Sequence, residues 1–101
     1  MNEVYNASIL NQYSNFDRAQ RKAYEVLGQY GDLHVSPRKD KKYRVINPVT
    51  KKWVDFGQLP YEDFTKHQDK ERRDNFRKRN HEWADRPVFS PSWLSYWILW
   101  S

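Results

Sequence analysis

Residues Thr65–Asn75 contain no apolar side chain, and this stretch constrains the fold more than any other part of the chain. Its sequence, TKHQDKERRDN, lies between the aromatic segment Tyr61–Phe64 and Phe76. Acidic residues precede basic ones by four positions at several places around it, a spacing that stabilises helices. A helix that is polar on every side bridges other elements, is held by ion pairs, or lies against a partner. The pattern predicts a long charged helix over residues 60–80.

The rest of the chain must supply the core, and its composition indicates that aromatic rings do so. Only 38% of the residues are hydrophobic and 31% are charged, whereas 17% are aromatic. Each large ring removes roughly 150–250 Å² of surface from water when it is buried. We therefore expect one small domain with a thin core, and more rings than such a domain hides completely.

The N-terminal part predicts an arm followed by an amphipathic helix. Met1–Tyr13 is polar and fits an arm or a short helix. In Asn15–Leu27 the apolar residues recur along one stripe, Ser14 or Asn15 is a suitable N-cap, and Gly28 suits the position after the helix end. We place an N-terminal arm at residues 1–13 and the domain at residues 14–101.

The middle of the chain predicts a small antiparallel sheet. Lys42–Ile46 and Lys52–Phe56 have strand character and are joined by Asn47–Lys51, whose asparagine and proline suit the start of a tight turn. Leu33–Val35 is a further short strand. Together these elements predict a hairpin extended into a β-meander.

The C-terminal residues are strongly aromatic. Ser90 and Pro91 suit the start of a helix, which favours a short helix over Trp93–Trp100; a buried strand is the alternative. The stretch is far shorter than the roughly 20 residues that cross a bilayer. The fold class expected for the whole chain is α+β, with an amphipathic helix, the small sheet, the charged helix and this aromatic helix.

Motifs for catalysis are missing. The absence of cysteine excludes disulfides and thiolate metal sites, and the three histidines are not spaced as in a standard zinc site. The sequence has no nucleophile elbow and no glycine-rich phosphate loop. We expect no enzymatic activity, no cofactor, no metal, no small-molecule substrate and no secretory signal.

Basic residues gather in two clusters, although the net charge is only +5. Such clusters bind nucleic-acid phosphates or an acidic protein face. The alternative is a solvated loop for the first cluster and helix-dipole complementarity for the second. The predicted binding residues are Arg38, Lys39, Lys41, Lys42, Arg44, Arg72, Arg73, Arg77, Lys78 and Arg79.

Two further groups have alternative interpretations. The rings of Trp93, Tyr96, Trp97 and Trp100 fit an interface with another protein, and they also fit closure of the protein's own core. His67 lies four residues from Asp63 and from Glu71, which places all three on one helix face. That spacing permits metal binding or acid–base chemistry, but we expect a structural histidine.

Several motifs resemble small proteins encoded by large double-stranded DNA viruses of eukaryotes and by their polinton-like relatives. The resemblance covers most of Tyr24–Trp100, and members usually carry histidine where Asp55 stands and lysine where Gln68 stands. Its motifs, in order, are RKDKKYRV (Arg38–Val45), KWVDFGQ (Lys52–Gln58), YEDFTKHQDKERRDNFRKR (Tyr61–Arg79), Ser90-Pro91 and Leu99-Trp100.

The resembling family has no assigned activity, so the resemblance implies a context and no catalytic residues. It implies a viral structural protein, a minor capsid component that contacts other virion proteins. Such a protein is located in the virion, and in the host cytoplasm or nucleus during assembly. The alternative is a small basic nucleic-acid-binding protein of the viral genome or core. An enzyme or nuclease cofactor is a third hypothesis, disfavoured by the missing motifs.

Overall fold

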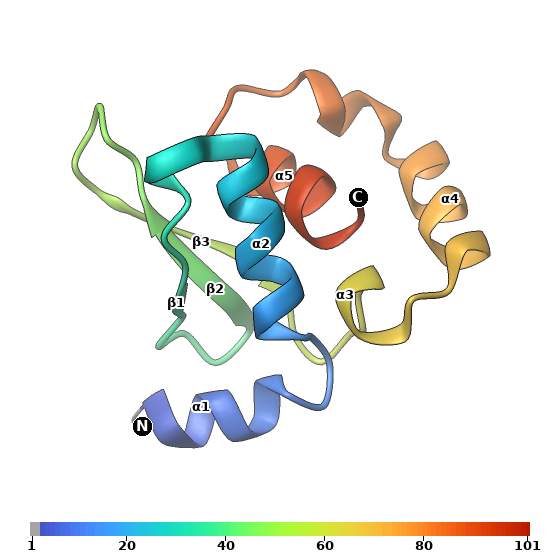
Figure 1. The fold of residues 1–101 in the computed structure, drawn as a ribbon, viewed down its shortest axis with the longest axis horizontal. Coiled ribbons are helices and arrows are strands. Elements are labelled where there is room, and N and C mark those ends of the chain that lie inside the picture. Colours follow the sequence, from blue (N-terminus) through green and yellow to red (C-terminus); the bar gives the residue numbers. More distant parts are fainter. Residues whose placement is uncertain (1–2) are drawn as a thin grey trace.

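A three-stranded antiparallel sheet forms one layer of the protein, and helices pack over one of its faces (Figure 1). The computed structural model describes residues 3–101. Strands β1 (His34–Val35), β2 (Lys41–Ile46) and β3 (Trp53–Gln58) lie side by side in that order. The expected α+β class, the hairpin and the short first strand are confirmed.

The helices that surround the sheet are short. Where the sequence predicted helix starts, side chains make the expected caps: Asn15 accepts the Arg18 N–H at 3.0 Å, and Ser90 accepts the Trp93 N–H at 3.3 Å. The aromatic C-terminal segment is therefore helical, as expected. In chain order the elements are α1 (Glu3–Leu10), α2 (Phe16–Leu27), the 3₁₀ turn η1 (Gly28–Tyr30), α3 (Phe64–His67), α4 (Lys70–Arg79), the 3₁₀ turn η2 (His81–Asp85), α5 (Pro91–Leu94) and the π-helical turn η3 (Ser95–Leu99).

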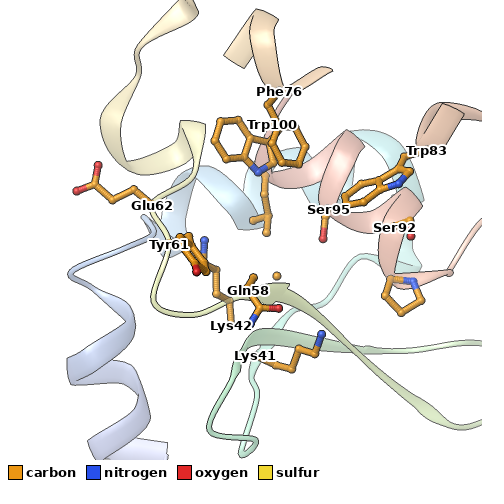
Figure 2. Close-up of a pocket in the computed structure, with 13 residues that line it drawn as sticks. Lys41, Lys42, Gln58, Tyr61, Glu62, Phe76, Trp83, Ser92, Ser95 and Trp100 are labelled. Carbon is orange, nitrogen blue, oxygen red and sulfur yellow. The ribbon is translucent and has the colours of Figure 1, made fainter. Parts of the chain in front are cut away.

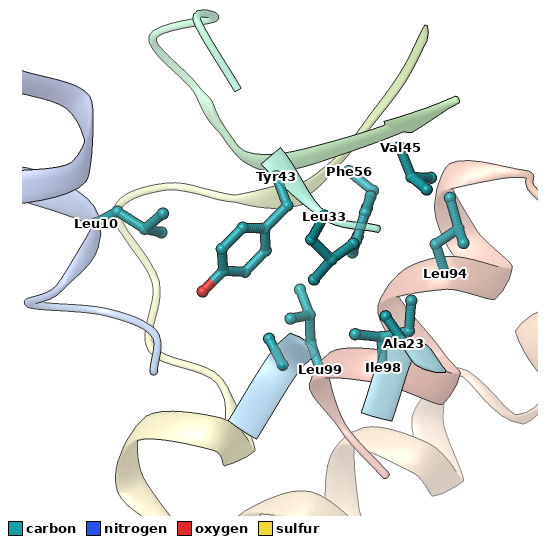
Figure 3. Packing of buried hydrophobic residues seen from close by; sticks show 10 residues of the cluster. Leu10, Ala23, Leu33, Tyr43, Val45, Phe56, Leu94, Ile98 and Leu99 are labelled. Atoms are coloured by element: carbon teal, nitrogen blue, oxygen red, sulfur yellow. The ribbon is translucent and has the colours of Figure 1, made fainter. Parts of the chain in front are cut away.

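The core lies between the sheet, α2 and the C-terminal helix, the name used here for α5 and η3 together (Figure 3). Tyr43 pairs with Phe56 across the two long strands, and both side chains are fully buried. Alternate residues of a strand point to the same face, so Val45 joins them on the core side. The buried apolar residues are Leu10, Ala19, Ala23, Leu33, Tyr43, Val45, Phe56, Leu94, Ile98 and Leu99.

The prediction of one helix over Pro60–Asn80 is wrong, because this segment forms the two separate helices α3 and α4. Asp63 caps α3 by accepting the Thr65 N–H at 3.0 Å, and Asp69 caps α4 by accepting the Glu71 N–H at 3.0 Å. Between the helices Gln68 is left-handed, with φ of 55°. Aspartate side chains that bond to nearby backbone N–H groups favour helix starts over helix interiors. Two such aspartates close together therefore divide the segment.

The segment expected as an N-terminal arm contains α1, and Met1 and Asn2 lie outside the described residues. Leu10, at the end of α1, is buried in the core at 3% exposure. Ser14, just beyond it, is also buried. The end of this segment is thus packed against the rest of the protein, while the division into an arm and a domain stays a prediction.

Candidate functional site

A pocket of about 290 Å³ opens between one end of the sheet, α4 and the C-terminal helix (Figure 2). We call it the aromatic pocket because rings from four different segments line it. Apart from the rings, strand residues form its floor and serines of the C-terminal helix form one side. It is lined by Lys41, Lys42, Gly57, Gln58, Tyr61, Glu62, Phe76, Trp83, Pro91, Ser92, Ser95, Leu99 and Trp100.

Three of the rings hold one another in place. Phe76 of α4 stacks on Trp100 with centroids 4.1 Å apart and planes 6° apart. Trp83 of η2 meets Phe76 edge-on at 5.7 Å. Tyr61 lies on the other side of the pocket and is 66% exposed. The pocket therefore has a fixed aromatic wall and one solvent-exposed ring at its rim.

Arg77 connects α4 to the C-terminal turn that carries Trp100. Its Nη1 donates to the carbonyl oxygens of Trp100 at 3.1 Å and Tyr96 at 3.3 Å. Its guanidinium carbon lies 4.1 Å from the Tyr96 ring centroid and 5.0 Å from that of Trp97. A guanidinium bonds well to carbonyls at a helix end and also stacks on rings. Arg77 thus keeps the aromatic wall in position.

A buried ion pair lies behind the pocket floor. The Lys42 ammonium donates to Asp63 Oδ2 at 2.9 Å, and the two side chains are only 3% and 0% exposed. Burial lowers the pKa of Lys42, because the loss of hydration outweighs the attraction of the Asp63 carboxylate. The pair joins β2 to the start of α3, and so fixes the loop that carries Tyr61.

The ion pair continues into a chain of buried hydroxyls. Tyr43 donates to Ser14 Oγ at 2.8 Å, Ser14 bonds to Thr65 Oγ1 at 3.0 Å, and Thr65 donates to Asp63. Burial raises the pKa of the Tyr43 hydroxyl. The network links the α1–α2 connection, strand β2 and helix α3, in addition to the backbone hydrogen bond from the Asp63 N–H to the Tyr13 carbonyl at 3.2 Å.

Gly57 allows the pocket floor to pack closely. Its φ of +83° is a conformation that side-chain-bearing residues rarely adopt. A Cβ there would lie 2.9 Å from Leu99 Cδ1 and 3.0 Å from Lys42 Cβ. The glycine therefore lets β3 approach both the C-terminal helix and the side chain of the buried lysine.

The predicted basic cluster on the sheet is divided by the fold. Lys42 is buried in the ion pair and is not part of the solvent-facing surface. Arg44 donates to Asp55 at 3.1 Å across the strands and lies 4.7 Å from the Trp53 ring centroid. Asp55 thus neutralises Arg44. The remaining members face solvent, with Arg38 and Lys39 exposed and Lys41 half-buried at the pocket.

The second basic cluster, on α4, is also partly committed to internal contacts. Arg77 holds the C-terminal turn, Arg73 donates to Asp74 at 2.9 Å, and Arg72 lies 3.6 Å from Glu62. Lys78 and Arg79 are exposed. The β1–β2 loop and α4 lie at different sides of the ribbon (Figure 1). Lys41 of the first cluster nevertheless lines the same pocket as Phe76 of α4.

The predicted aromatic interface residues mainly close the protein's own fold. Tyr96 is 7% exposed. Trp97 donates its indole N–H to the Ala84 carbonyl at 3.3 Å, and Trp93 packs against the core. Trp100 is half-buried and lines the pocket, so it is the member of this group that reaches a candidate binding site.

The structure does not bring His67 together with both of its predicted neighbours. Asp63 forms an ion pair with Lys42, and Glu71 belongs to the separate helix α4. His67 Nδ1 accepts the Asp69 N–H at 2.9 Å, and its ring lies 5.4 Å from that of Trp100. Burial, followed by the charge of Arg72, lowers the pKa of His67. Residues 3–101 contain no cluster of three side chains able to hold a metal ion.

Several pocket residues were not singled out from the sequence. Tyr61, Phe76 and Trp83 come from three different segments, and Ser92 and Ser95 are ordinary surface-type residues. One sequence feature pointed to Phe76: aromatic residues stand on both sides of the fully polar stretch Thr65–Asn75. A ring next to such a stretch must pack against another element, and Phe76 does so from α4.

Chemically, the aromatic pocket combines ring walls with a few polar groups at its edge. Lys41 supplies a cation, and Ser92 and Ser95 supply hydroxyls that face the same space (Figure 2). A pocket of this kind has room for an apolar group with a polar attachment. The fold and the pocket thus define a small α+β protein with an open aromatic pocket.

Comparison with known proteins places part of the chain in relation to a sequence family. Residues 31–80 match a family model described as "Family of unknown function (DUF5754)". The matched residues run from β1 to α4, and so include the buried ion pair and two of the four pocket rings. No curated protein and no solved structure matches the chain. Within residues 3–101, no helix combines the length and the apolar composition that crossing a membrane requires.

Proposed function

We propose that the protein is a non-catalytic module that binds another protein through the aromatic pocket. The main support is that Tyr61, Phe76, Trp83 and Trp100, from four separate segments, converge on one open pocket. Tryptophan and tyrosine dominate the energetics of protein interfaces, because they bury a large area at a low entropic cost. A partner that inserts one apolar side chain would cover these rings.

The size of the pocket supports a single side chain as the occupant. Its volume is about 290 Å³, at the lower end of the roughly 300–1,000 Å³ typical of small-molecule sites. A nucleotide cofactor or an extended substrate needs more enclosed space than this. An anchor residue on a partner protein needs no more.

The polar groups of the pocket fit binding better than catalysis. In the described part of the chain, no carboxylate or imidazole is hydrogen-bonded to the hydroxyl of Ser92 or Ser95, so neither has a base to activate it. Lys42 and Glu62 are each engaged in an ion pair. The lining residues therefore lack an arranged nucleophile and base.

We further propose that the partner is a capsid protein, and that the protein is a minor structural component of a virion. This context is taken from the motifs that resemble proteins of large double-stranded DNA viruses. The protein is then located in the particle, and in the host cytoplasm or nucleus while particles assemble.

Site-specific crosslinking tests the proposal. A photoreactive phenylalanine analogue replaces Tyr61 at the rim of the pocket, and in a matched control it replaces Tyr24, which is 48% exposed on α2 and does not line the pocket. In purified particles we expect the probe at Tyr61 to crosslink to a capsid protein identified by mass spectrometry. The protein should also stay with particles from which the genome has been released. A crosslink from Tyr24 alone, or loss of the protein together with the DNA, would contradict the proposal.

Nucleic-acid binding remains the alternative function, and a salt titration tests it. Six of the ten predicted cations, Arg38, Lys42, Arg44, Arg72, Arg73 and Arg77, already make internal contacts. A protein that neutralises several phosphates loses affinity for duplex DNA steeply with salt, with a log–log slope of about −0.9 per phosphate. We expect weak binding and a shallow slope. Tight, steeply salt-dependent binding would favour the alternative.

A further inference from the structure

We infer that the segment bound in the aromatic pocket carries an apolar side chain next to an aspartate or glutamate, and that Lys41 pairs with this acid. The inference rests on the proposed function and adds the chemistry of the partner. It follows from the charges of the lining residues, the direction of the polar groups and the position of Glu62.

Charge complementarity is the first argument. Three lining residues carry a full charge: Lys41, Lys42 and Glu62. Lys42 is neutralised by Asp63 at 2.9 Å, and Glu62 lies 3.6 Å from Arg72. Within residues 3–101 the Lys41 side chain has no ion-pair or hydrogen-bond partner. The pocket therefore presents one uncompensated positive charge, and an occupant with one carboxylate complements it.

The direction of the polar groups is the second argument. Figure 2 shows Ser95 and Lys41 facing a common space, with Ser92 beside them and the stacked rings of Phe76 and Trp100 on the other side. Each of the two hydroxyls can donate a hydrogen bond to an oxygen placed there. An occupant with an apolar side chain against the rings would place its carboxylate beside Lys41, within reach of the serine hydroxyls. It would then contact the aromatic side and the polar side of the pocket together.

Glu62 favours a single acid over a polyanion. Its carboxylate lies at the other rim of the pocket and points away from the common space (Figure 2). A strand of nucleic acid that tracks a groove needs a row of cations. Because Glu62 is paired with Arg72 and Lys42 with Asp63, the described lining residues offer no second free cation to continue a row that begins at Lys41. A peptide segment with one acid needs only Lys41, and its acid lies at the Lys41 end.

Peptide binding followed by NMR tests the inference. The probes are acetylated and amidated pentapeptides with a central phenylalanine and a neighbouring glutamate, glutamine or lysine, added up to millimolar concentration to ¹⁵N-labelled protein. We expect the indole N–H signals of Trp83 and Trp100 to shift. The glutamate peptide should bind about two- to fivefold more tightly than the glutamine peptide, the range for one exposed ion pair. The lysine peptide should bind most weakly.

Variants identify the cation. Lys41→Gln should make the glutamate and glutamine peptides bind equally, and Lys41→Glu should reverse the order of the glutamate and lysine peptides. Lys51→Glu is the matched control, because Lys51 is an exposed lysine in the hairpin turn at the other end of the long strands and should leave the order unchanged. Unaltered backbone spectra outside the pocket show that each variant is folded.

The outcomes separate the inference from the proposed function. If all three peptides bind equally and Lys41→Glu changes nothing, the acidic partner is ruled out while docking in the pocket stands. If no peptide binds at millimolar concentration but the probe at Tyr61 still crosslinks to a capsid protein, the inference fails and the proposed function stands. If neither occurs, both fail. A single-stranded oligonucleotide that shifts the same indole signals and displaces the glutamate peptide would assign the pocket to nucleic acid and overturn the inference.

Discussion

The sheet and helix α4 both carry a cluster of basic side chains, but the two clusters contribute to the structure in different ways. On β2, Lys42 is fully enclosed and bound to Asp63, in a region where the neighbouring Tyr43 and Phe56 are also completely buried. On α4 no residue is buried, and the helix is attached through the Phe76 ring and the Arg77 guanidinium. The same residue types thus form part of the interior in one region and the outer wall of a pocket in the other.

This difference shows how a charge changes its role with its surroundings. A buried charge is costly to leave unpaired, so Lys42 and Asp63 depend on each other. A charge on an exposed helix is screened by water, and an ion pair there contributes little to the free energy of unfolding. In the sheet region, the loss of one buried charged group should therefore lower the free energy of unfolding strongly. On α4, mainly changes at Phe76 and Arg77 should lower it.

The largest expected effect is at the buried pair. Asp63→Asn keeps an oxygen for Thr65 but leaves the Lys42 ammonium without its counter-charge. Breaking a buried pair on one side costs about 3–5 kcal/mol. Chemical denaturation should show a loss of this size in the free energy of unfolding. The matched change Asp74→Asn removes the exposed partner of Arg73 and should cost about 0–1 kcal/mol. Equal losses for the two variants would remove the distinction between the two regions.

A smaller loss is expected at the attachment of α4. Arg77→Leu removes two hydrogen bonds from a charged donor and the contacts with the Tyr96 and Trp97 rings, which together are worth about 2–3 kcal/mol. Lys78→Ala, one residue further on, should change the free energy of unfolding by about 0.5 kcal/mol or less. Arg77→Lys should restore little, because a single ammonium lacks the planar fork. Full rescue by lysine would mean that charge alone holds the helix.

Tyr43 provides a test of the buried network through pH. At neutral pH, Tyr43→Phe should lower the free energy of unfolding by about 1 kcal/mol, the value of its hydrogen bond to Ser14. Burial raises the pKa of Tyr43 in the folded protein above its ordinary value of 10.0. Its contribution is therefore complete below pH 10 and is lost as the pH rises above it, since the unfolded chain releases the proton first.

The measurement is the difference in unfolding free energy between wild type and Tyr43→Phe across this range. The difference should shrink as the pH rises above 10, because only the wild type loses stability through this group. Other alkaline effects act on both proteins and cancel. A difference that stays constant up to pH 11 would show that the hydroxyl is not held in its protonated form by burial.

The smallest expected effect concerns His67, at the joint between α3 and α4. Burial lowers the pKa of His67 below its ordinary value of 6.5. As the pH falls through 6.5 the unfolded chain takes up the proton first, so the free energy of unfolding decreases. His67→Asn retains an acceptor for the Asp69 N–H and should flatten this slope. NMR titration of the His67 ring should give a pKa below 6.5, and a higher value would contradict the enclosed position beside Trp100.

The elements that were predicted correctly are those specified by neighbouring residues. Asn15 and Gly28 delimit α2, the asparagine–proline turn locates the hairpin, and Ser90 with Pro91 starts the last helix. Charge spacing also predicted helix around α4. It failed to predict the break, because the ion-pair rule takes no account of Asp63 and Asp69 as caps. Their positions, two or three residues before the N–H groups they bind, were the signal that was missed.

The candidate site was predictable only in part. Lys41 and Trp100 were among the residues expected to bind, and both line the pocket. Lys42 carries the same charge as Lys41 and is its neighbour, yet it is buried with Asp63. Alternation along a strand assigns the two side chains to different faces. It does not say that an aspartate from the next segment will meet one of them.

What the sequence determined by itself was the position of the caps, the turn and the alternation of the strands, because these depend on contacts within a few residues. It was left to the packing of distant segments to settle which cations are neutralised, that the Phe76 ring and the Arg77 guanidinium help to hold α4, and that Tyr61, Phe76, Trp83 and Trp100 line one pocket. The reason is physical: burial and ion pairing depend on groups brought together from distant positions, and their energies are set by how much water the surrounding fold excludes.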